Sequence, residues 1–265
     1  MSDRPELAAE YDRLADVYDA WAASDAEAEP SRRFYVQECC AEAGPVAELG
    51  VGTGRIALEV ARRGKSLLGI DISAHMLAVC REQAERQGLD DRLRLRQDDA
   101  RTFELEEPAA LITFPFRGIA HFLTQQAQHE LLVNVRRNLR PGGRFIFDHD
   151  VIQPDEAQRR SGLPQLRRSV TNADGTSWVA WNVFHFNLVA QRMSGFVIVE
   201  TLDAQGDVVR RNYRPLTAAW FSSQQVPLML ARAGLAVEAA FGDFEHGPLT
   251  TSSRHQVWIA RRPDG

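Results

Sequence analysis

Between residues 45 and 150, short apolar runs alternate regularly with longer amphipathic stretches. The runs have the length of buried strands, and the stretches between them have the 3.6-residue hydrophobic period of helices. Strands separated by helices in this way form a parallel sheet, because each connection must cross the sheet before the next strand begins. Right-handed crossovers then place helices on both faces. We therefore predict an α/β fold with a doubly wound sheet.

The boundaries of the expected elements follow from the same periods. Strands are expected over 45–50, 66–71, 92–97, 109–114 and 141–150, and later over 235–244 and 255–262. Helices are expected over 6–21, 31–43, 54–64, 73–88, 125–139 and 222–234. Ser31 and Ser73 have the position and chemistry of helix N-caps.

The pattern changes after residue 150. The segments 176–191, 192–203 and 206–217 are long and β-rich, and DAQGD at 203–207 is typical of a hairpin turn. The helix-and-strand pattern of the core resumes after them. We therefore expect one domain over 1–265, with an antiparallel β insertion over about 151–220.

Composition and charge argue against several classes of protein. No apolar run reaches the roughly 18 residues that a membrane-spanning helix needs. The acidic N-terminus lacks the pattern of a signal peptide, so we expect a cytoplasmic protein that does not bind membranes. The net charge of −5 argues against a nucleic-acid partner, and the basic stretch 159–168 is expected to be a solvated loop.

The stretch ELGVGTG at 48–54 places three glycines, Gly50, Gly52 and Gly54, between a strand and a helix. Glycines at such a turn let a ligand approach the bare backbone. Dinucleotide sites read GxGxxG, but Arg55 stands where the third glycine of a continuing motif would fall. Glu48 at the strand end would repel a pyrophosphate and would suit a ligand that carries a cationic amine.

Four stretches together resemble the motifs of class I S-adenosylmethionine-dependent methyltransferases. They are VAELGVGTGRIALEVARRG (46–64), LLGIDIS (67–73), RQDDAR (96–101) and LRPGGRFIFD (139–148). The resemblance covers about residues 30–150 and 222–262. It implies a Rossmann-like, doubly wound, mostly parallel seven-stranded sheet with helices on both faces and an antiparallel β insertion after the fifth strand. It also implies S-adenosylmethionine as cofactor and S-adenosylhomocysteine as product.

The resemblance assigns roles to matching residues. It implies cofactor contacts from Gly50, Gly52 and Gly54 to the methionine and ribose parts, Glu48 to the amino group, Asp71 to the ribose hydroxyls, Ile72 and Met76 to the adenine faces, Asp99 beside Ala100 to the adenine amine, and Phe114 through its backbone. On spacing alone Asp98 fits the adenine role nearly as well as Asp99.

The N-terminal stretch YDRLADVYDAW (11–21) resembles that of methyltransferases acting on small molecules. In those enzymes a helix closes over the cofactor. By this resemblance residues 1–43 form a helical lid, and Tyr18 and Arg33 reach the cofactor. Both could equally lie on the surface of amphipathic helices.

Methyl transfer from a sulfonium needs an acceptor held in line with the methyl carbon, and a hydroxyl acceptor usually needs a base as well. His149 and His121 are the candidates for a base or an orienting group, although packing alone would explain His121. No metal is expected, because the fourth strand ends in TFPF (113–116) without a carboxylate. The same tetrad departs from the N/D-PP-Y/F pattern of amide and nucleobase N-methyltransferases.

The favoured function is metal-independent N- or O-methylation of a small molecule, such as a secondary metabolite or sugar intermediate. The alternatives are a methyltransferase of RNA or protein, a nicotinamide-dependent oxidoreductase, and a silent binding or structural protein that keeps the fold. The acidic net charge argues against a methyltransferase of RNA or protein, and Arg55 argues against the oxidoreductase. The three intact glycines argue against a silent protein. An exposed β insertion is compatible with a homodimer.

Overall fold

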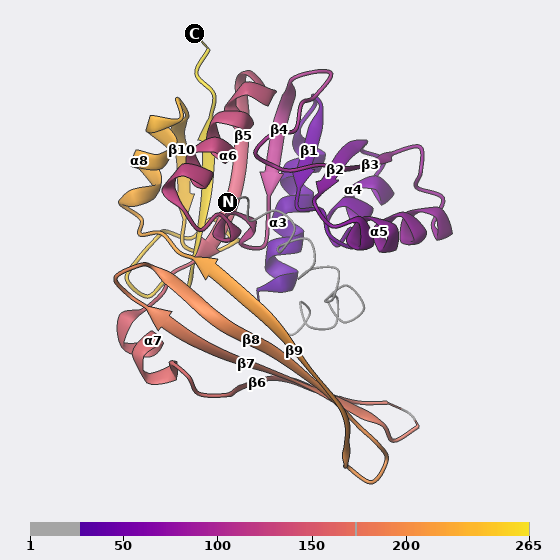
Figure 1. Cartoon of the computed structure of the whole chain (residues 1–265). Helices are drawn as coiled ribbons and strands as arrows, with labels where there is room; N and C mark the ends of the chain where they lie inside the picture. The colour runs from indigo at the N-terminus through magenta and orange to yellow at the C-terminus, as the bar shows by residue number, and fades with distance from the viewer. Residues whose placement is uncertain (1–26, 173, 265) are drawn as a thin grey trace.

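The computed structural model describes residues 27–172 and 174–264, which form two sheets (Figure 1). The main sheet has seven strands in the order β10-β11-β5-β4-β1-β2-β3, and the second has four in the order β6-β7-β8-β9. The helix expected over 6–21 lies outside the described residues, and so does Tyr18.

The main sheet confirms the predicted fold class. Its strands are β1 (Val46–Leu49), β2 (Leu67–Asp71), β3 (Leu93–Gln97), β4 (Ala109–Phe114), β5 (Leu139–Asp150), β10 (Ala236–Phe241) and β11 (His255–Arg261). The first five pair in parallel, and β11 runs antiparallel between β5 and β10. Each predicted strand is present within a few residues of its expected bounds.

Helices cover both faces of this sheet, as the alternation predicts. One face buries α3 (Ala28–Ala41), α4 (Ala57–Arg62) and α5 (Ala74–Arg86); the other buries α6 (Gln125–Asn138) and α8 (Gln225–Arg232). Neighbouring residues of a strand divide between the two layers: Leu111 packs with the first group and Ile112 with the second. Among the described residues, no helix is both long and apolar enough to cross a membrane.

Caps account for some of the helix boundaries. Ser73 accepts from the Met76 N–H at 3.0 Å at the start of α5, as predicted, and Thr124 accepts from the Ala127 N–H at 3.1 Å at the start of α6. The prediction for Ser31 is wrong. It is buried inside α3, which begins three residues earlier and has Glu27 at its N-cap.

The second sheet is an arm that extends away from the main sheet (Figure 1). It consists of β6 (Gln165–Thr171), β7 (Ser177–Asn187), β8 (Arg192–Leu202) and β9 (Val208–Ala219), preceded by α7 (Pro154–Arg160). All its neighbouring strands pair antiparallel. The prediction of a loop over 159–168 is wrong, because this stretch contains the end of α7 and the start of β6. The arm begins where β5 ends, at the edge of the sheet that carries the candidate site.

Candidate active site

A cavity of about 250 Å³ lies at the carboxyl ends of β1, β2 and β4. Doubly wound sheets bind their ligands at this edge. Of the residues singled out in the sequence, the cavity is lined by Glu48, Gly50, Gly52, Asp71, Ile72, Met76, Asp99, Ala100, Phe114 and His121. The fold thus brings three of the four motifs and the segment after β4 into one site, whereas no residue of the fourth motif, 139–148, lines the cavity.

All three glycines of the turn after β1 have a left-handed backbone, with φ of 62° at Gly50, 56° at Gly52 and 91° at Gly54. These positive φ values are not helical, and α4 begins only after them, at Ala57, three residues after the predicted start. Protein atoms also crowd two of these positions. A Cβ on Gly54 would lie 2.6 Å from Cys80 Sγ, and one on Gly50 would lie 2.9 Å from the Phe114 ring. Gly52 faces the cavity, whereas Gly54 does not line it.

Asp71 ties the end of β2 to the glycine turn. Its Oδ2 accepts from the Gly52 N–H at 2.8 Å, and its Oδ1 accepts from the Ser73 N–H at 2.9 Å. A carboxylate accepts hydrogen bonds, which suits the hydroxyl groups of a ligand. Asp71 therefore both shapes the turn and faces the cavity.

Glu48 is the buried acid of the site, with 2% of its surface exposed. Desolvation raises its pKa to about 8, against a smaller opposing effect of Arg55 and reinforced by Asp71. Within the described chain its Oε2 has no hydrogen-bond partner. An orphaned buried carboxyl oxygen is costly unless a ligand supplies a donor. The amino group of an aminoacyl ligand is such a donor.

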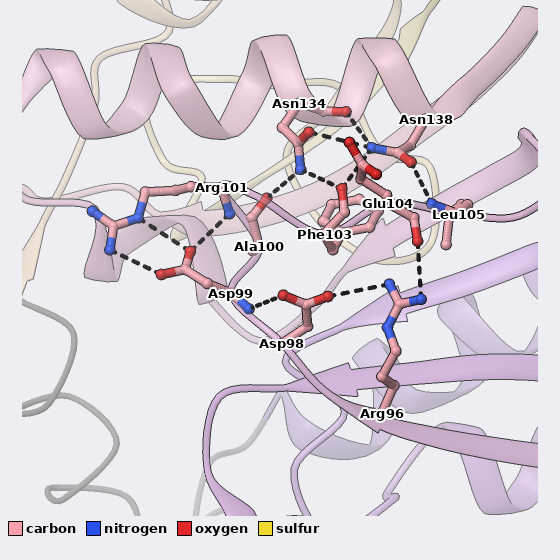
Figure 2. A network of polar contacts seen from close by, with 10 residues as sticks. All are labelled: Arg96, Asp98, Asp99, Ala100, Arg101, Phe103, Glu104, Leu105, Asn134 and Asn138. Carbon is pink, nitrogen blue, oxygen red and sulfur yellow. Dashed lines mark hydrogen bonds and ion pairs between the residues drawn. The ribbon is translucent and has the colours of Figure 1, made fainter.

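Residues Asp98 to Arg101 form the adjoining wall. The segment that they begin runs on to Leu105 and takes part in a network of polar contacts (Figure 2). Asp99 accepts from the backbone and the Nε of Arg101 and pairs with its Nη2 at 2.9 Å. Asp98 accepts from the Asp99 N–H at 2.8 Å and lies 3.4 Å from Arg96 Nη2. Both acids line the cavity and both already have protein partners, so the choice between them for the adenine amine stays a prediction.

Two asparagines of α6 form hydrogen bonds with the backbone of this segment (Figure 2). Asn134 donates to the carbonyls of Ala100 at 3.3 Å and Phe103 at 3.0 Å. Asn138 also donates to the Phe103 carbonyl, at 3.1 Å, and its Oδ1 accepts from the Leu105 N–H at 2.8 Å. Side-chain amides thus satisfy the backbone of a loop that has no strand partner there.

Replacing Asn138 by alanine is expected to cost about 2–3 kcal/mol of the free energy of unfolding, because it orphans the half-buried Leu105 N–H and removes a donor from the buried Phe103 carbonyl. Urea denaturation measures this. Gln126→Ala on the exposed face of the same helix is the matched control and should change it by less than about 0.5 kcal/mol. Equal effects of the two substitutions would contradict the bracing role.

The side of the cavity next to β4 is mostly apolar. It is lined by Phe114, Pro115, Phe116, Gly118, His121, Phe122, Leu123, Ala127 and Thr217. The ring of Phe114, rather than its backbone alone, shapes this wall, since a Cβ on Gly118 would lie 2.0 Å from it. Desolvation lowers the pKa of His121 to about 4, so its imidazole is neutral at pH 7.

The remaining candidates lie elsewhere. Arg33 is on the exposed side of α3 and does not line the cavity. His149 is 1% exposed and packs edge-on against Phe221, with ring centroids 5.2 Å apart. Its burial lowers its pKa to about 4, and it is not among the cavity-lining residues. His149 therefore does not line the cavity as His121 does, and a direct role of His149 stays a prediction.

Several residues of the wall were not singled out as site residues from the sequence, among them Arg55 and Thr217. Arg55, noted only as a departure from a dinucleotide motif, lies in the cavity wall with its guanidinium 4.7 Å from the Phe116 ring. Thr217 comes from the last strand of the arm. No local pattern marks a residue that a distant insertion delivers to the site, so sequence reasoning had no signal for Thr217.

The residues present fit S-adenosylmethionine. Glu48 offers an orphaned acceptor, Asp71 offers a carboxylate that faces the cavity, and Ile72 and Met76 offer apolar surface for a flat base. Within the described residues no group of three or more His, Cys, Asp or Glu side chains is arranged to hold a metal ion.

Comparison with known proteins points the same way. The profile of a methyltransferase domain family matches residues 46–143. A curated phosphatidylethanolamine N-methyltransferase of Cereibacter sphaeroides is 39% identical over 103 residues, which is 37% of this chain and 49% of that protein. The chain spans about half the length of most of the curated relatives it matches.

Solved structures resemble the whole chain. The CcbJ methyltransferase from Streptomyces caelestis has a TM-score of 0.78 and 26% identity over 96% of this chain and 98% of that one. CalS10, an amino pentose methyltransferase from Micromonospora echinaspora solved with the cofactor bound, has a TM-score of 0.68 at 19% identity, over 93% and 96%. The second likeness shows a shared fold, while the first extends over core and arm at higher identity.

Proposed function

We propose that this chain, which matches a methyltransferase domain family over residues 46–143, methylates a nitrogen or oxygen of a small natural product or sugar. One observation carries the proposal. A single cavity joins an acid-bearing side, suited to the cofactor, to an apolar side with a neutral histidine. The likeness to an amino pentose methyltransferase supports an amine as the first acceptor to test.

The cofactor, when bound, supplies the activated methyl group and its own leaving group. The chain's residues then have three tasks. Glu48 and Asp71 bind and orient the polar ends of the cofactor. The apolar wall excludes water and holds the acceptor close to the methyl carbon. His121, neutral at pH 7, can accept a hydrogen bond from the acceptor N–H or O–H.

Among the described residues that line the side of the cavity next to β4 there is no carboxylate. An ammonium ion would therefore gain no counter-ion there, and it has no lone pair to attack with. We propose that an amine acceptor binds and reacts in its neutral form, without a metal ion. The setting that fits such an enzyme is the cytoplasm, with the small acceptor as its partner.

His121→Asn is expected to lower the turnover number by about 10–100-fold while leaving affinity for S-adenosylhomocysteine within about threefold, since it touches the acceptor side only. Steady-state kinetics and calorimetry measure the two effects. His129→Asn, on α6 and not in the cavity wall, is the control. A proportional loss of cofactor affinity would show that His121 only supports the fold.

The experiment that tests the proposed function is a methyl-transfer screen. The protein is supplied with S-adenosylmethionine and a panel of amino sugars, other small amines, phenols and carboxylates. Released S-adenosylhomocysteine and product mass are measured. A gain of one methyl group identifies both the reaction and the acceptor. Turnover on RNA or protein substrates alone would contradict the small-molecule proposal.

A further inference from the structure

The residues after β4 form a tight turn that their side chains disfavour. Phe116 has φ 55° and Arg117 has φ 65°, and the Gly118 N–H donates to the Pro115 carbonyl at 3.2 Å. Two consecutive positive φ values closed by such a bond are typical of a type I′ turn, which glycine and asparagine normally form. A residue with a Cβ pays a steric cost in this region. Contacts from outside the turn must therefore hold it.

Asp148, near the end of β5, supplies those contacts. Its Oδ1 accepts from the Phe116 N–H at 2.9 Å, and its Oδ2 accepts from the Arg117 N–H at 3.1 Å. The Tyr35 hydroxyl donates to Oδ1 at 2.6 Å. Asp148 is 1% exposed and Tyr35 is 0% exposed. Because the carboxylate is buried and held from behind by Tyr35, its two oxygens are pre-oriented toward the two strained residues.

Asp150, two residues further along β5, holds the side chain of the same turn. Its Oδ1 lies 2.6 Å from Arg117 Nε, and His255 Nδ1 lies 3.1 Å from the same oxygen. The Arg117 guanidinium in turn lies 4.8 Å from the centre of the Phe116 ring. One strand thus fixes both the backbone and the side chain of the turn.

This turn is part of the cavity wall, because Pro115, Phe116 and Gly118 all line the cavity. Phe116 also links it to the cofactor side. The guanidinium of Arg55, which directly follows the glycine turn, lies 4.7 Å from the Phe116 ring. If the turn relaxed to ordinary negative φ values, the Phe116 ring would leave its place between the two sides of the site.

We propose that Asp148 is a positioning residue of the methyl-transfer site: its two hydrogen bonds keep Phe116 and Arg117 left-handed and so fix the wall of the cavity. It acts through the turn and does not itself line the cavity. The inference rests on the proposed function in taking this cavity as the site where the cofactor binds.

The substitution Arg117→Gly provides a specific test. Arg117→Ala and Arg117→Gly both remove the guanidinium, but only glycine removes the steric cost of positive φ. Asp148→Asn leaves one acceptor oxygen and presents an amide N–H₂ to the other backbone donor. We expect Asp148→Asn to weaken S-adenosylhomocysteine binding by about tenfold or more in the Arg117→Ala background and by less than about threefold in the Arg117→Gly background.

Calorimetry with S-adenosylhomocysteine measures these affinities, and urea denaturation of the same variants measures stability. Tyr35→Phe, which keeps both backbone hydrogen bonds, should show equal effects in the two backgrounds. Equal losses for Asp148→Asn in both backgrounds would overturn the inference. Failure of the wild-type protein to bind S-adenosylhomocysteine would instead refute the proposed function. In that event the free energies of unfolding of the same variants, measured by urea denaturation, still decide whether Arg117→Gly relieves the loss of Asp148.

Discussion

Asp71→Ala is expected to weaken S-adenosylhomocysteine binding by about 2–3 kcal/mol, roughly a hundredfold. Two causes contribute. The substitution removes a charged acceptor that faces the cavity, and it also orphans the Gly52 N–H, to which Asp71 Oδ2 is bonded at 2.8 Å. Because Gly52 lies in the cavity wall with a left-handed backbone, the turn itself should lose order. Isothermal titration calorimetry measures the affinity.

Controls separate this effect from a general change of charge. Asp90→Ala removes an exposed acid after α5 and should leave the affinity within about twofold. Asp71→Asn keeps the shape and one acceptor oxygen, so an intermediate loss is expected. An Asp71→Ala affinity within about threefold of wild type would show that Asp71 serves the turn at most and that the ribose assignment is wrong.

The Asp71 case illustrates what local pattern can reveal. A strand that ends on an acid, followed by a serine cap, is visible in seven residues, and it correctly places Asp71 in the cavity. The hydrogen bond from the Gly52 N–H to Asp71 was not predicted, since it depends on how β1 and β2 pair. The alternation predicted the order of strands and helices, because hydrophobic period depends on burial alone.

The features that escaped prediction depend on contacts between distant parts of the chain. The strand β6 was taken for a loop because its arginines hide the alternation, and it becomes a strand only by pairing with β7. The left-handed turn at Phe116 has no glycine to mark it and depends on Asp148, which is 32 residues away. Thr217 reaches the cavity because β9, the last strand of the arm, runs back toward the main sheet and Thr217 lies near its end.

Glu48 makes cofactor binding depend on pH. In the free protein desolvation raises its pKa to about 8, so at pH 7 the carboxyl is mostly protonated. A cationic amino group bound beside it would stabilise the carboxylate and lower that pKa. Binding must then release a proton, and affinity should rise about tenfold per pH unit, or about thirtyfold between pH 5.5 and 7. Calorimetry in buffers of different ionisation enthalpy measures the proton release.

Glu48→Gln removes the titration and should make the affinity nearly independent of pH over this range, at a lower value. The exposed Glu82→Gln is the control and should keep the wild-type pH profile. The stability of the free protein should respond with the opposite sign. A carboxyl whose folded pKa is raised binds its proton more tightly in the folded state, so unfolding free energy falls as pH rises from about 4.5 toward 8. A bound cofactor would therefore offset the cost of burying the ionised Glu48 carboxylate, which the free protein bears. A flat affinity profile in wild type would mean that the amino group does not bind beside Glu48.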